Sequence, residues 1–121
     1  MLKKLKKIWW KWNYSRKLSG DAFLKEAMAV YSDSTVEDLE FLKTQDLKFK
    51  AKVEEELAGL QNATEYAQTR RRRDLEKDLE EVDIRIKGRE RSIEAVQKEA
   101  ATFRSQAQEM WHRRDIFKRK F

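Results

Sequence analysis

The sequence has no cysteine and no proline, and its 121 residues include only three glycines. Without cysteine the chain has no disulfide, no thiolate nucleophile and no cysteine-ligated metal site. Sandwiches, barrels and chains of βαβ units need many tight turns, which glycine and proline supply, so these folds are excluded. The scarcity of turn residues therefore predicts an all-α chain built from a few long helices.

Long apolar runs are also lacking. Charged residues make up 41% of the chain, whereas a compact domain usually carries about 25%. The longest uninterrupted apolar run is Ala27–Tyr31, far short of the roughly 20 residues that a membrane span needs. Ile8–Trp10 is too short for the apolar part of a signal peptide. We therefore expect an intracellular protein, either cytoplasmic and peripheral to a membrane or inside a virion.

Positive charge gathers at both ends of the sequence. Residues 1–20 hold seven basic residues and no acidic one, and residues 104–121 hold six basic residues against two acidic ones. Since the net charge is only +6, residues 21–103 are acidic overall. This polarity predicts an anionic partner at the ends, a lipid surface or nucleic acid. A mitochondrial presequence is the less favoured interpretation, because such peptides are rich in arginine and serine rather than lysine and tryptophan.

Residues 1–19 are predicted to form a basic, tryptophan-rich amphipathic helix. On a helix, Leu2, Leu5, Ile8, Trp9 and Trp12 fall within one stripe of about 120°. The lysines of the segment lie outside this stripe, and Trp10 and Tyr14 flank its polar side. Such a composition is typical of a helix that lies among lipid headgroups. We expect the following residues to bind a membrane or another anionic partner: Leu2, Lys3, Lys4, Leu5, Lys6, Lys7, Ile8, Trp9, Trp10, Lys11 and Trp12. Two alternatives remain open, namely docking into a protein groove and stacking of the tryptophans on single-stranded bases.

Turn-prone residues divide the next part of the chain. Gly20 is expected to cap the end of the first helix, so that residues 20–34 form a short helix and a turn. Ser34 and Glu37 match the capping box that begins a helix. From there, residues 35–121 are predicted to form a coiled-coil rod with a basic C-terminal end.

A heptad pattern runs through the second half of the sequence. Fourteen positions from 75 to 121 follow alternating steps of four and three over more than six heptads, and all of them are apolar except Arg89 and Arg114. This pattern predicts a coiled-coil seam. The seam residues are Leu75, Leu79, Val82, Ile86, Ile93, Val96, Ala100, Phe103, Ala107, Met110, Phe117 and Phe121. The pattern keeps its phase through Gly88, which we interpret as a weak position costing about 1 kcal/mol inside a helix. A single helix cannot bury this seam, so the chain must fold back on itself or associate with a second copy or another helical protein.

A weaker seam lies upstream, between Leu39 and Ala67, and it includes Asp46 and Glu56. Its phase is one residue out of step with the seam that begins at Leu75. A stutter within one continuous helix would correct the phase. A reversal near residues 59–62 would also correct it and would give a hairpin of unequal arms. The sequence leaves both arrangements open.

Motifs for catalysis or metal binding are weak. Three isolated glycines cannot build a phosphate-binding loop. The single histidine, His112, lies in a basic tail and is poorly suited to act as the general base that activates a nucleophile. Glu109 and His112 have the spacing of carboxylate di-iron helices, but one chain lacks the second pair. We therefore expect no metal, no cofactor and no enzymatic activity. A basic cluster offers either phosphate contacts or, as the favoured interpretation, salt-bridge donors; it consists of Arg70, Arg71, Arg72 and Arg73.

These patterns predict an all-α, elongated coiled coil, either one long helix or an unequal helical hairpin, with an N-terminal basic amphipathic helix. As architecture alone, this order is similar to membrane-remodelling proteins of the phage-shock and ESCRT types and to short assembly proteins of virions. We expect a structural or assembly protein without a small-molecule substrate. It would self-associate or dock on a larger complex and bind an anionic membrane surface through its first segment. The alternative is a nucleic-acid-binding structural protein, virion-internal or chromosome-associated, that uses both basic ends.

Overall fold

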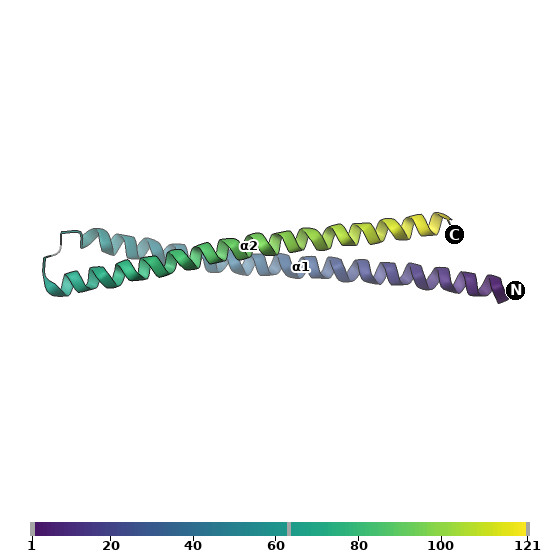
Figure 1. The fold of residues 1–121 in the computed structure, drawn as a ribbon, viewed down its shortest axis with the longest axis horizontal. Coiled ribbons are helices and arrows are strands. Elements are labelled where there is room, and N and C mark those ends of the chain that lie inside the picture. Colours follow the sequence, from purple (N-terminus) through teal and green to yellow (C-terminus); the bar gives the residue numbers. More distant parts are fainter. Residues whose placement is uncertain (1, 63, 121) are drawn as a thin grey trace. The chain divides into compact units, whose positions relative to one another are not determined.

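The computed structural model describes residues 2–62 and 64–120, and these residues form two helices and no strand (Figure 1). Helix α1 spans Leu2–Gly59 and helix α2 spans Tyr66–Lys120. The all-α prediction is confirmed. Of the two arrangements that the sequence left open, the structure has the reversal, since α1 ends at Gly59 and α2 begins seven residues later.

The chain divides into two compact units, and each unit pairs a segment of α1 with a segment of α2. Unit 1 comprises Met1–Thr35 and Val96–Phe121, and unit 2 comprises Val36–Ala95 with the turn between the helices. In unit 1 the paired segments are antiparallel, because Phe23 contacts Trp111 while the earlier Tyr14 contacts the later Phe117.

In unit 2 the two helical segments are also antiparallel. Close to the turn, Glu56 accepts hydrogen bonds from Arg71, and further from the turn Asp46 accepts one from Arg89. Leu60 N donates to the carbonyl oxygen of Leu57 at 2.9 Å, so the last turn of α1 tightens before the chain reverses.

The heptad residues of α2 are covered by α1 of the same chain. Within unit 2, Leu75, Val82, Ile86 and Ile93 are buried, and Val82 has no exposed surface. Within unit 1, Ala100, Ala107 and Phe117 are buried. Four further seam residues are half-buried, namely Leu79 in unit 2 and Val96, Phe103 and Met110 in unit 1. Phe121 lies outside the described residues. Folding back therefore removes this seam from water without a second chain.

The covered face of α1 is much more polar than that of α2. Buried and half-buried positions of α1 follow steps of four and three, but several of them are polar: Lys11, Ser15, Lys25, Ser32, Lys43, Asp46 and Lys50. Leu39, Asp46 and Val53 of the weaker predicted seam lie on this face, whereas Leu42, Phe49 and Glu56 are exposed and Ala63 lies outside the described residues. Two of these lysines pair with acids of α2: Lys43 lies 3.5 Å from Glu90, and Lys50 lies 2.8 Å from Asp83.

Helix α1 differs from the prediction at two places, since it runs without a break through Gly20 and through residues 32–35. The hydroxyl of Ser19 donates to the carbonyl of Ser15, and that of Thr35 donates to Tyr31, so hydroxyls bond back to the preceding turn as they do inside helices. Packing against α2 offsets the weak helix propensity there. The arms are consequently of similar length, 58 and 55 residues, and not unequal as expected.

Candidate functional site

The antiparallel pairing of unit 1 places the start of α1 beside the end of α2, where the N and C ends lie side by side (Figure 1). The ring of Phe117 on α2 lies 5.4 Å from the ring of Trp10 and 4.7 Å from the ring of Tyr14, measured between centroids. Two basic segments that are separate in the sequence therefore meet in one region of the molecule.

An apolar patch occupies the first turns of α1. It consists of Leu2, Leu5, Ile8, Trp9 and Trp12, whose exposed fractions lie between 57% and 75%. With Lys6, these side chains line a shallow hollow of about 570 Å³. The patch shows the spacing that the sequence predicted, and α2 does not cover it.

Trp10 lies apart from the apolar patch, on the side of the helix where its spacing places it. Its ring stacks on Tyr14 at 5.7 Å and meets the edge of Phe117. One residue of offset turns a helical side chain by about 100°, which is enough to move Trp10 from the outer face to the side next to α2. Trp10 therefore contributes to the attachment of the first segment to α2, while Trp9 and Trp12 face outward.

Further along unit 1, contacts that sequence reasoning missed hold α1 and α2 together. Trp111 Nε1 donates to Glu26 Oε1 at 2.7 Å, and the Trp111 ring meets the ring of Phe23 edge-on at 5.0 Å. Arg104 forms an ion pair with Asp33. Trp111 follows the seam residue Met110, and a lone tryptophan beside a seam is the signal that could have revealed this contact.

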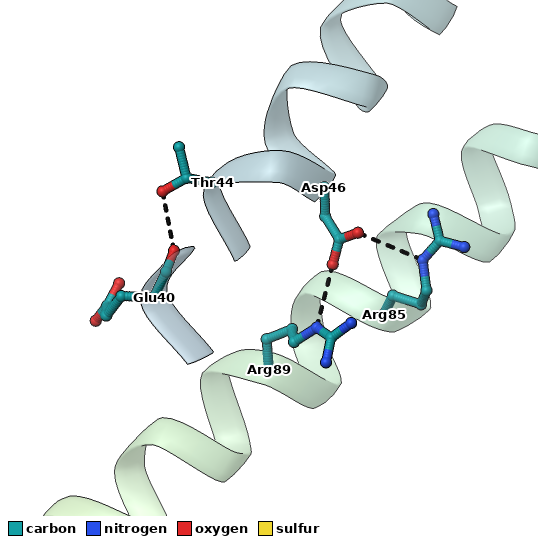
Figure 2. A network of polar contacts seen from close by, with 5 residues as sticks. All are labelled: Glu40, Thr44, Asp46, Arg85 and Arg89. Atoms are coloured by element: carbon teal, nitrogen blue, oxygen red, sulfur yellow. Dashed lines mark hydrogen bonds and ion pairs between the residues drawn. The ribbon is translucent and has the colours of Figure 1, made fainter. Parts of the chain in front are cut away.

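In unit 2 several ion pairs join the two helices beside their apolar contacts. Figure 2 shows Asp46, which is almost buried, between two arginines of α2: Arg85 Nε lies 3.6 Å from Oδ1, and Arg89 Nε lies 3.3 Å from Oδ2. The same figure shows the Thr44 hydroxyl donating to the carbonyl oxygen of Glu40 within α1. Asp46 is thus a charged group in a seam position whose charge is balanced from the other helix.

The predicted arginine cluster lies just after the turn, at the start of α2. Arg71 donates two hydrogen bonds to the Glu56 carboxylate, at 2.9 and 3.1 Å, and this contact lowers the pKa of Glu56 and raises the pKa of Arg71. Arg72 lies 3.9 Å from Glu76 on the same helix, and Arg70 and Arg73 are exposed. Two of the four arginines, Arg71 and Arg72, are thus engaged in ion pairs.

The Glu109–His112 pair forms no metal centre in unit 1. Glu109 accepts a hydrogen bond from Arg113, and His112 is exposed. Over residues 2–62 and 64–120, no group of three or more acidic or histidine side chains is placed to hold a metal ion. Neither described helix combines the length and the apolar character that crossing a bilayer requires.

Comparison with known proteins does not connect the chain to a family. No family model matches the sequence, and no curated protein and no solved structure matches it either. The functional argument therefore depends on the geometry of the two units.

Proposed function

We propose that this protein is a non-enzymatic coiled-coil scaffold that binds anionic membrane surfaces through residues 2–12. The observation that carries the proposal is the exposed apolar patch, which lies where both basic ends of the chain meet. An apolar surface of this kind, rimmed by basic residues, is typical of a helix that lies in the headgroup region of a bilayer.

Two contributions to the free energy would favour binding of residues 2–12 to a membrane. Burial of the patch supplies a hydrophobic term, to which each tryptophan contributes most because of its large surface. Each basic residue near an anionic leaflet adds about 1 kcal/mol at low ionic strength, and salt screens this term. Binding should accordingly need anionic lipid and weaken as salt is added.

The scaffold part of the proposal is supported by the distribution of exposed apolar side chains. The regular burial of the α2 heptad positions supports a coiled-coil packing within each unit. All but three of the exposed large apolar side chains lie on α1, and outside the apolar patch they include Phe23, Leu24, Val30 and Tyr31. These residues would accept a second copy or another helical protein.

Binding of the full chain to vesicles tests the proposal. We expect co-sedimentation and a blue shift of tryptophan fluorescence with vesicles of phosphatidylcholine and phosphatidylserine, and neither with phosphatidylcholine alone. Trp9→Ala should weaken binding by about tenfold or more, because it removes the largest kind of side chain in the patch. Tyr66→Ala is the matched control, since Tyr66 is an exposed aromatic residue at the start of α2, outside the patch and outside the residues that would accept another protein, and it should bind as the wild type does.

Equal effects of the two substitutions would contradict the proposal, as would equal binding to neutral vesicles. Retention of DNA at about 0.15 M salt without vesicle binding would support the nucleic-acid alternative instead. In that case, neutralisation of seven phosphates predicts a log–log salt slope of about −5 to −6.

A further inference from the structure

A second hollow adjoins the apolar patch in unit 1, and its lining is basic. This basic groove, of about 430 Å³, is lined by Lys11, Ser15, Arg16 and Ser19 of α1 and by Arg114 and Lys118 of α2. Ile8 and Trp12 of the apolar patch form its border. Cations from both helices therefore converge next to exposed apolar surface.

The positive charge of the basic groove has no internal counter-charge. Its lining includes four cations and no acidic residue. Within residues 2–62 and 64–120, no ion pair joins any of the four to a carboxylate, whereas Arg104 and Arg113 nearby on α2 both have acidic partners. Like charges that are gathered without a partner raise the local potential and attract an anion.

Two of the cations are held in position by contacts of their own. The Arg16 guanidinium lies 5.2 Å from the centre of the Trp12 ring, and the Arg114 guanidinium lies 5.3 Å from the centre of the Trp111 ring. Arg114 Nε also donates a long hydrogen bond, 3.4 Å, to Ser15 Oγ. A guanidinium that stacks on a ring keeps its N–H donors in its own plane, where they suit the oxygens of a phosphate.

We propose that the basic groove binds the phosphomonoester headgroup of an anionic lipid, while the acyl chains lie against the apolar patch. This inference rests on the proposed membrane function and names the headgroup. A phosphomonoester carries about −1.5 to −2 charges at neutral pH and three acceptor oxygens. Two arginines and two lysines match that charge and those acceptors better than they match the single charge of a phosphodiester. The shared border with Ile8 and Trp12 favours a lipid over a soluble phosphate.

A comparison of two lipids and two variants tests the headgroup. The full chain is titrated with phosphatidylcholine vesicles that contain phosphatidic acid, a phosphomonoester, or phosphatidylserine, a phosphodiester, adjusted to equal surface potential. We expect the wild type to bind the phosphatidic acid vesicles about fivefold more tightly. Lys118→Gln should abolish this preference. Lys120→Gln removes the same charge from an exposed position outside the groove, so it should weaken binding to both vesicles equally and keep the preference.

Each failure has a distinct meaning. Equal binding to both lipids, with Lys118→Gln behaving as Lys120→Gln does, would overturn the headgroup assignment and leave membrane binding intact. Absence of binding to either anionic vesicle would overturn the proposed function itself. Inorganic phosphate without vesicles should bind about tenfold more weakly or worse, because it has no acyl chain to bury; equal affinity would assign the groove to a soluble phosphate and overturn the lipid assignment. Far-UV circular dichroism should show wild-type helicity in both variants.

Discussion

Replacement of Val82 by alanine should destabilise the chain much more than the same replacement of Ile84, two residues further along α2. Val82 has no exposed surface, whereas Ile84 is 65% exposed. Val82→Ala removes two buried methyl groups and leaves a cavity, which together cost about 2 kcal/mol. Ile84→Ala removes atoms that are mostly in water, and the higher helix propensity of alanine offsets the loss, so we expect a change within about 0.5 kcal/mol.

Thermal unfolding followed by far-UV circular dichroism measures this difference. A loss of about 2 kcal/mol should lower Tm by about 8 °C, while Ile84→Ala should leave Tm within about 2 °C of the wild type. Measurement at two protein concentrations separates folding of the single chain from association, since only association makes Tm depend on concentration. Equal effects, or a larger effect of Ile84→Ala, would refute the assignment of the face that α2 turns toward α1.

Three further substitutions in unit 2 test other parts of the structure. Asp46→Leu should lower the free energy of unfolding by about 1–2 kcal/mol in urea, because it leaves the half-buried guanidinium of Arg89 without its carboxylate; an increase would show that burial of an apolar side chain outweighs the ion pairs. Gly88→Ala should add about 1 kcal/mol in the same assay, since the position is helical and a Cβ there meets no atom within 4 Å, and unchanged stability would contradict this. Arg71 lowers the pKa of Glu56 from its usual 4.5. The pair therefore stabilises the fold above pH 4.5, and this stabilisation is lost as the pH falls through the folded-state pKa. The difference between wild type and Glu56→Gln should therefore be small at neutral pH, because the pair is exposed, and should vanish once the pH lies below the folded-state pKa of Glu56; a difference that persists in stronger acid would contradict the ionic origin.

The face of α2 was predictable because twelve of the fourteen positions from 75 to 121 that follow its heptad steps are apolar. Val82, Ile93 and Ala100 all lie on the face that the heptad steps select. The covered face of α1 was not predictable in the same way, since Asp46 and Lys50 look like solvent-exposed residues until their partners on α2 are known. Apolar periodicity fails where ion pairs across the helices take the place of apolar contacts.

Local helix signals misled where tertiary packing was stronger. Gly20 and Ser34 have the residue types of a helix end and a helix start, but each costs only about 1 kcal/mol or less inside a helix. Contacts with α2 nearby, such as that between Phe23 and Trp111, compensate for that cost. No short window of the sequence carries this information, because the contacting residues of α2 lie far along the chain: Arg104 follows Asp33 by 71 residues, and Trp111 follows Phe23 by 88.

Only the apolar patch of the candidate site could be predicted from the sequence, and the basic groove could not. The apolar patch is a property of one helix, and Trp9 and Trp12 reveal it by their spacing. The basic groove requires Arg114 and Lys118 to lie beside Lys11, and that neighbourhood arises only from the antiparallel pairing of unit 1. Net charge at the two ends of the sequence predicts an anionic partner, but it does not indicate where on the molecule such a partner would bind.

A disulfide between the two helices tests most directly that unit 1 pairs within one chain. Ala29 and Ala107 are both buried and line one hollow between α1 and α2, and the chain has no cysteine of its own. Oxidation of the Ala29→Cys/Ala107→Cys variant at low concentration should give a monomer with an internal disulfide that still binds anionic vesicles. The Ala29→Cys/Ala101→Cys variant, with its second cysteine at an exposed position, should not form that bond. Disulfide-linked dimers alone, or free thiols in both variants, would mean that the basic ends do not meet in one chain and would contradict the account.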